Sequence, residues 1–151
     1  MKHIIQFKIF ATVFVLLMSL ASFNSEAAEA RLLQVEATRE KVVFQVSDSI
    51  PGKWNLTLNN VRNIQNAIGK DKVDIEIVAY GPGINMLKLK SKVGSKIDKA
   101  LADGIRIVAC KNTMKHMKLT VANMLPSIAY VPSGAVELMR KQEDGWAYIR
   151  P

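Results

Sequence analysis

The sequence predicts an α/β fold in which a mainly parallel sheet of about five strands is covered by helices on both faces. Two observations predict it. Runs rich in β-branched and aromatic residues alternate with stretches of about ten residues that carry an apolar stripe at helical spacing. Breaks rich in Gly, Pro, Ser or Asn separate them. Strands that alternate with helices form parallel βαβ units with right-handed crossovers, which places helices on both faces of the sheet.

Four runs predict β-strands, and an extended segment closes the chain. The run at 73–80 first alternates between apolar and acidic residues and then becomes wholly apolar, which is typical of a strand that enters a buried sheet. Gly81-Pro82-Gly83 follows it and breaks the strand. The predicted strands are residues 41–47, 73–80, 105–110 and 128–131, and the closing segment is 146–149.

The clearest predicted helix begins near Pro51 and ends at Gly69. Its apolar residues recur three and four positions apart and form one stripe, which consists of Trp54, Leu58, Val61, Ile64 and Ile68. A second helix is predicted from Val93 until Gly104 ends it. Further helices are predicted at 84–90 and 135–142, and the Met- and Lys-rich stretch at 112–125 is expected to be helical in pieces.

The first residues predict export. Two lysines precede an apolar stretch at 9–20, and small residues offer cleavage points after Ala27, Ala28 or Ala30. The stretch is shorter than the roughly 20 residues that a membrane-spanning helix needs. We therefore expect a cleaved signal peptide at 1–28, an N-terminal extension at 29–40, one domain at 41–151, and a bacterial periplasmic location without stable membrane insertion after cleavage. The alternative is an uncleaved anchor.

Composition limits the class of protein. The chain is 49% hydrophobic and 23% charged, a globular balance that argues against intrinsic disorder. Its formal net charge is +8, and most of this charge remains once residues 1–28 are removed. A basic surface attracts anionic lipid, nucleic acid or an acidic partner, or serves solubility alone. The lysines at 88, 90, 92, 96 and 99 are expected on a solvated helix face, and without interleaved aromatic residues nucleic-acid binding is not expected.

Small and polar residues follow every predicted strand. In open α/β sheets ligands bind beyond the carboxyl ends of the strands, so these segments are expected to converge on a crevice. The candidate binding residues there are Asp48, Gly81, Gly83, Lys111, Asn112, Thr113, Lys115 and Ser133. The Gly81–Gly83 run lacks the third glycine of a dinucleotide fingerprint, so a turn is the expected use and no cofactor is predicted.

Cys110 is the only cysteine, and it ends the predicted strand at 105–110. In an exported chain a lone thiol stays free, reacts, or pairs with another molecule. If Asn112 or Thr113 caps a helix, its free N–H groups face the sulfur and favour the thiolate, as do the nearby lysines. The alternative is a buried, inert cysteine. No metal is predicted because His and Cys are too few, although Met114 and Met117 keep a copper(I) site as a minor hypothesis.

Several motifs resemble the DsrE/DsrF-like family, which includes sulfur-carrier subunits of sulfur-relay and sulfur-oxidation systems. They are Trp54-Asn55-Leu56 after the first strand, Val78-Ala79-Tyr80-Gly81-Pro82-Gly83, the strand that ends in Cys110 with Asn112-Thr113-Met114 behind it, and Tyr130-Val131-Pro132. The resemblance covers roughly residues 41–151. It implies a three-layer α/β/α fold and a homo-oligomer, and it looks like an exported branch of the family.

The resemblance also implies a chemistry for Cys110, which matches the cysteine that accepts a persulfide in the sulfur-carrying members. Two functions are therefore expected. The first is a sulfur carrier or sulfurtransferase-like protein that works with a donor or acceptor protein. The second is a non-catalytic module that binds a small anion or supports protein assembly, with a structural cysteine. The exported location departs from the cytoplasmic sulfur relays of the family.

Overall fold

Within residues 39–151, which the computed structural model describes, five parallel strands form one sheet in the order β4-β3-β2-β1-β5. The expected signal peptide lies outside the described residues. Each strand agrees with its predicted run to within one residue at either end, because β-branched runs are a local signal. The strands are β1 (Glu40–Val46), β2 (Val73–Ala79), β3 (Arg106–Cys110), β4 (Ala129–Val131) and β5 (Ala147–Ile149).

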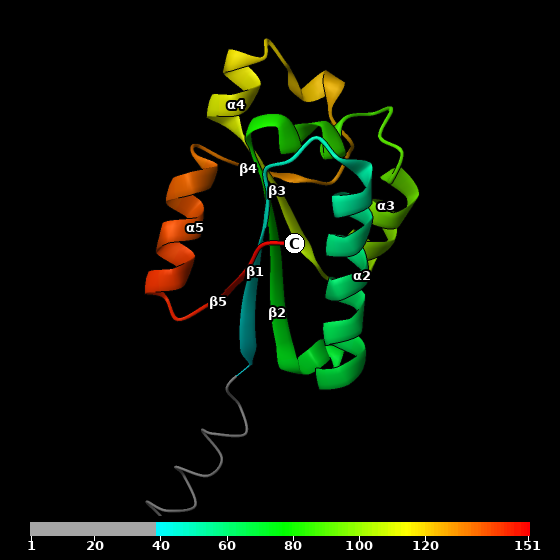
Figure 1. Ribbon diagram of the computed structural model, residues 1–151, viewed down its shortest axis with the longest axis vertical. Helices are drawn as coiled ribbons and strands as arrows, with labels where there is room; N and C mark the ends of the chain where they lie inside the picture. The colour runs from blue at the N-terminus through cyan, green and yellow to red at the C-terminus, as the bar shows by residue number, and fades with distance from the viewer. Residues whose placement is uncertain (1–38) are drawn as a thin grey trace, which may run out of the picture. The chain divides into compact units, whose positions relative to one another are not determined.

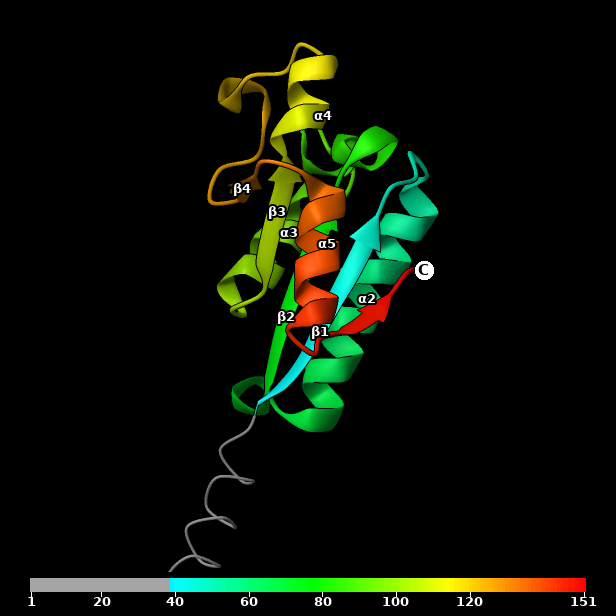
Figure 2. The same cartoon turned by 90° about the vertical axis from the view of Figure 1, so that its left-hand side faces the viewer.

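Helices cover both faces of the sheet and complete the expected three layers. Figures 1 and 2 show α2 and α3 on one face and α5 on the other. The α-helices are α2 (Pro51–Ile68), α3 (Gly94–Ala102), α4 (Lys111–His116) and α5 (Gly134–Glu143), and the short 3-10 helices are η1 (Lys70–Lys72), η2 (Gly81–Leu87) and η3 (Val121–Asn123). No helix among residues 39–151 is long and apolar enough to cross a bilayer.

The predicted helix at 84–90 is wrong in kind and in position. The segment is a 3-10 helix that begins at Gly81 and ends at Leu87. The chain beyond it pairs with a distant segment: Lys88 forms a bridge with Met124, and the Leu89 N–H donates to the Asn123 carbonyl at 3.1 Å. Because these groups bond across the chain, the lysines at 88, 90 and 92 lie in a loop and not on the helix face that the sequence predicts.

Alternate residues of each strand divide the core into two halves. Phe44, Ile77 and Ile107 belong to the cluster that α2 and α3 cover, where the predicted stripe of α2 packs. Val78 and Val108 belong to the cluster under Leu138 of α5. A strand places successive side chains on opposite faces. Cys110, two residues after Val108 in the same strand, therefore lies on the α5 side of the sheet.

One charged residue interrupts the face under α5. The Glu76 carboxylate is fully buried, and it pairs with Arg106 of β3 and, at 3.0 Å, with Lys141 of α5. The Lys141 ammonium also lies 3.9 Å from the centre of the Trp146 ring. A buried carboxylate needs such partners, so this cluster fixes where α5 rests on the sheet.

The strand order produces one reversal of direction. From β1 to β4 the chain moves stepwise across the sheet, and it then crosses to the far side of β1 to form β5. Because crossovers are right-handed, the reversal puts α5 on the face opposite α2 and α3. Met114 of α4 packs in the α2–α3 half of the core, whereas Leu138 of α5 packs in the other half. The chain thus leaves the neighbouring strands β3 and β4 toward opposite faces, and ligands bind at such switch points.

Candidate functional site around Cys110

Cys110 stands at this switch point, as the last residue of β3 and the N-cap of α4. Its sulfur accepts a hydrogen bond from the Thr113 N–H at 3.5 Å. Neither Asn112 nor Thr113, the two caps considered from the sequence, is the N-cap, because Cys110 has extended backbone angles and the helix begins directly at Lys111. The sulfur itself therefore does what a capping oxygen usually does.

Hydrogen-bond donors surround the sulfur. Burial by itself raises the pKa of the Cys110 thiol, since its side chain is only 4% exposed. The Thr113 hydroxyl and the N–H groups of Thr113, Gly134 and Asn112 act against burial, and together they hold the pKa below its ordinary value. These donors come from the first turns of α4 and α5. The fold therefore favours the thiolate, which is the nucleophilic form of cysteine.

Thr113 connects the sulfur to the neighbouring segment. Its hydroxyl oxygen accepts the Gly81 N–H at 3.0 Å, which ties the first turn of α4 to the start of η2. The Asn112 N–H donates to the Pro132 carbonyl at 3.2 Å and ties the same turn to the end of β4. These bonds hold together three of the segments that the sequence predicted to converge.

An open groove of about 480 Å³ lies beside this turn. Thr113 belongs to the groove wall and donates its N–H to the sulfur, whereas Cys110 itself is not part of the wall. The wall is formed by Ser49, Gly81, Pro82, Asn85, Asn112, Thr113, His116 and Met117. Of the predicted binding residues, Gly81, Asn112 and Thr113 are thus brought together here.

The other predicted binding residues near Cys110 are not part of the groove wall. Lys111 and Lys115 are exposed on α4. Ser133 is the N-cap residue of α5, and its side chain makes no capping bond. Gly83 serves packing, because a Cβ there would lie 2.2 Å from the Val46 carbonyl oxygen. His116 is exposed and lines the groove.

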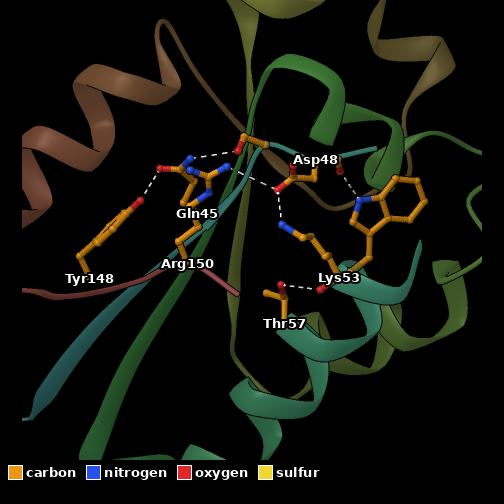
Figure 3. Close-up of polar contacts among 8 residues, drawn as sticks. Gln45, Asp48, Lys53, Thr57, Tyr148 and Arg150 are labelled. Atoms are coloured by element: carbon orange, nitrogen blue, oxygen red, sulfur yellow. Dashed lines mark hydrogen bonds and ion pairs between the residues drawn. The ribbon is translucent and has the colours of Figure 1, made fainter. Parts of the chain in front are cut away.

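Asp48 also lies outside the groove wall. Its carboxylate pairs with Lys53 at 3.1 Å and with Arg150 at 3.6 Å, as Figure 3 shows. The hydrogen bond from Lys53 lowers the pKa of this carboxyl below its usual value. The Asp48 carbonyl also accepts the Trp54 indole N–H at 2.7 Å. Asp48 therefore joins the start of α2 to the chain after β5.

Two residues near the sulfur were missed by sequence reasoning. The Gly134 N–H helps to lower the pKa of Cys110, and a Cβ on Gly134 would lie 2.9 Å from Cβ of Tyr80. The ring of Tyr80 therefore packs against the turn that carries this donor. The signal was present, because Gly134 belongs to the Pro-Ser-Gly segment after the fourth predicted strand. Sequence alone does not show whether the N–H of Ser133 or that of Gly134 lies near the thiol.

The described residues offer few ligands for a metal ion. No group of three or more His, Cys, Asp or Glu able to hold a metal occurs within the described part of the chain. Met114, one of the two methionines of the copper(I) hypothesis, is buried in the α2–α3 half of the core. Met117 is exposed and lines the groove.

Comparison with protein families decides the relationship. A model of the DsrE/DsrF-like family matches residues 40–151. The chain belongs to this family. The match spans β1 to the end of the chain and contains the Cys110 site. Among curated proteins no match is found.

Solved structures agree with this assignment. A protein of unknown function from Methanobacterium thermoautotrophicum, MTH1491, is 33% identical, covers 74% of this chain and 99% of its own length, and has a TM-score of 0.71. The conserved protein BT1422 of unknown function from Bacteroides thetaiotaomicron is 18% identical, with coverages of 74% and 95% and a TM-score of 0.62. The ychN protein from E. coli is 8% identical, with coverages of 76% and 100% and a TM-score of 0.58. The last two likenesses concern the fold alone.

Proposed function

We propose that this DsrE/DsrF-like protein is a sulfur carrier, in which Cys110 takes up sulfane sulfur as a persulfide and passes it to an acceptor thiol. The observation that carries the proposal is the place of the Cys110 sulfur at the switch point of the sheet, where it caps α4 and accepts the Thr113 N–H at 3.5 Å. Donors that stabilise a thiolate also stabilise a persulfide anion in the same place.

The transfer consists of two displacements. The Cys110 thiolate attacks the outer sulfur of a donor persulfide, a new S–S bond forms at Cys110, the donor S–S bond breaks, and the inner donor sulfur leaves as a thiolate. An acceptor thiolate then attacks the outer sulfur on Cys110, and the Cys110 thiolate is regenerated. The transferred sulfur keeps its oxidation level, so the cycle needs no oxidant or reductant. A low thiol pKa favours Cys110 both as attacking and as leaving group near neutral pH.

One observation favours the alternative of a non-catalytic module. The Cys110 side chain is 4% exposed, and a buried thiol at a strand end is consistent with a structural role. In that case the groove beside Thr113 holds a small anion or a partner, and the sulfur takes no part in chemistry. The two functions differ in whether sulfur becomes attached to Cys110.

Intact mass spectrometry distinguishes them. Purified protein is incubated with glutathione persulfide, and wild type is expected to gain the mass of one sulfur atom, whereas Cys110→Ser gains none. Reduction with dithiothreitol should remove the added mass. A gain of a whole glutathione identifies a mixed disulfide and not sulfur transfer. Wild type that gains no sulfur while its thiol reacts freely after unfolding excludes the carrier function.

We also propose that the protein is exported to the periplasm. The basic and apolar start of the chain and the small residues from Ala27 to Ala30 support export to the periplasm. Sequencing the amino terminus of protein from a periplasmic extract tests this, and the mature chain is expected to begin between Ala28 and Arg31. A retained Met1 in the membrane fraction contradicts it.

A further inference from the structure

Two segments at the carboxyl end of the sheet carry lysines and no acidic residue. No Asp or Glu occurs at 77–97 or at 104–136. We give the name basic rim to six of these lysines, which are Lys88, Lys90 and Lys92 from the loop after η2 and Lys111, Lys115 and Lys118 from α4 and the turn that follows it. In the part of the chain that the structure describes, none of the six belongs to an ion pair.

The two lysine-bearing segments are joined. The Leu89 N–H donates to the Asn123 carbonyl at 3.1 Å, and the Leu125 N–H donates to the Leu87 carbonyl at 2.8 Å. These bonds fasten the loop after η2 to the segment that follows α4. Figure 1 shows α4 and η2 at the same end of the molecule, beyond the arrowheads of the strands. The lysines of the basic rim therefore come from segments at the end of the sheet that contains the groove.

Elsewhere on the described domain, acidic residues pair with several of the positive side chains. Arg39 pairs with Asp74, Lys70 and Lys99 pair with Asp103, and Arg106 and Lys141 pair with Glu76. At the carboxyl end of β1 the Asp48 carboxylate is already engaged by Lys53 and Arg150. The excess of positive charge is thus concentrated at the Cys110 end. Such a field draws an anionic partner toward that end and orients it there.

Apolar side chains are exposed among these lysines. Leu89 and Val121, from the two joined segments, are more than half exposed, and Met117 lines the groove. All three are aliphatic, so this surface lacks the aromatic platforms on which nucleic-acid bases stack. The groove is concave and contains Asn85 and Asn112, whose side-chain amides can bond a peptide backbone. A concave groove fits an extended polypeptide better than a flat bilayer.

We infer that the basic rim and the groove dock an acidic polypeptide, whose exposed apolar residue lies beside Met117 and which thereby contacts Thr113, the neighbour of Cys110. The inference rests on the proposed sulfur-carrier function only in naming this polypeptide a sulfur donor or acceptor. The docking surface itself rests on the charge distribution and on the shape of the groove.

Binding is tested apart from sulfur chemistry with Cys110→Ser protein. The probe is a fluorescent peptide of alternating Glu and Leu with one central Cys, and the control peptide carries Lys in place of Glu. Fluorescence anisotropy is expected to show binding of the Glu peptide, with an affinity that falls as salt rises, and no binding of the Lys peptide. The triple change Lys111→Gln, Lys115→Gln and Lys118→Gln should weaken binding about tenfold.

A matched triple change supplies the control. Lys41, Arg62 and Lys72 are exposed, lie away from the groove wall, and carry the same total charge. Their replacement by Gln should leave the affinity for the Glu peptide within about twofold, since rim charges act locally at physiological salt. Equal losses in both triple variants would mean that net charge alone attracts the peptide, and the docking site is then refuted.

Two further probes separate the classes of anionic partner. Vesicles that contain phosphatidylserine and a single-stranded oligonucleotide are presented to the same proteins. If either binds and the Glu peptide does not, the partner is a membrane or a nucleic acid and the inference is wrong. If the Glu peptide binds while wild type takes up no sulfur from glutathione persulfide, the surface stands and the carrier function fails. If wild type takes up sulfur but does not bind the Glu peptide, the carrier function stands and the docking surface is refuted.

Discussion

The Thr113 hydroxyl serves two neighbours at once. Its oxygen accepts the Gly81 N–H at 3.0 Å, and its proton contributes to the low pKa of Cys110. A hydroxyl can do both because it has one donor and two acceptor positions. At the residue scale this side chain is therefore the most informative one to change.

Thr113→Val removes the hydroxyl and nearly preserves the shape of the side chain. We expect the pKa of Cys110 to rise, because a donor to the thiolate is lost, and stability to fall by about 1 kcal/mol, because the Gly81 N–H loses its acceptor. The pH profile of iodoacetamide alkylation reports the pKa, and its midpoint should move upward. Thr113→Ser keeps the hydroxyl and should retain the wild-type midpoint. A Val profile that overlays wild type excludes the hydroxyl as a donor.

The same shift in Cys110 predicts how stability depends on pH. The folded pKa lies below the ordinary pKa that the thiol has in an unfolded chain. Between these two values the unfolded chain holds a proton that the folded chain has released, so the free energy of unfolding rises with pH. This contribution to stability is complete above the pKa of the unfolded chain. It is lost as pH falls through the pKa of the folded chain. Urea unfolding at several pH values should show it in wild type and not in Cys110→Ser.

At the scale of elements, η2 lies against the end of β1. The Gly83 N–H donates to the Ser47 and Tyr80 carbonyls, each at 3.1 Å, and a Cβ on Gly83 would lie 2.2 Å from the Val46 carbonyl oxygen. Such a contact is far inside van der Waals distance, and the backbone on both sides must move to relieve it. Since Gly81 and Asn85 belong to η2, the groove wall depends on this close approach.

Gly83→Ala is therefore expected to destabilise the protein by about 1–3 kcal/mol, as overpacking of a core does. Gly52→Ala is the matched change, because Gly52 lies in α2 and a Cβ there would have no atom within 4 Å, and helix propensity predicts a gain of up to about 1 kcal/mol. Urea unfolding midpoints compare the two. Equal midpoints for Gly83→Ala and wild type would show that η2 does not pack on β1 in this way.

Elements with a local signal were predicted from the sequence, and elements fixed by distant partners were not. The stripe from Trp54 to Ile68 and the β-branched runs identify α2 and the strands without knowledge of the fold. The end of η2 depends on the bonds of Leu87 and Leu89 to the segment after α4, and strand order depends on where the crossover after β4 lands. The same holds for Asp48, whose partner Arg150 lies at the other end of the domain sequence.

At the scale of the whole molecule, one side of the described domain carries exposed apolar residues that the monomer does not use. Val136 and Met139 lie one helical turn apart on α5 and are 39% and 51% exposed, and Tyr148 of β5 is 40% exposed. Met139 and Tyr148 line the same shallow depression. Trp146 and Ile149 of the closing segment are partly buried and pack against the two halves of the core. We name Val136, Met139 and Tyr148 the α5–β5 patch.

We propose that the α5–β5 patch is the centre of a homo-oligomer interface, because such interfaces are apolar at the centre. Light scattering at micromolar concentration is expected to give a multiple of the mass of one chain for wild type. Met139→Lys should lower that mass, since a buried lysine without a partner is costly. Leu56→Lys is the control, because Leu56 is 48% exposed on α2, on the opposite face of the sheet. A wild type of single-chain mass contradicts the oligomer, whereas an equal loss of mass in both variants places the interface elsewhere.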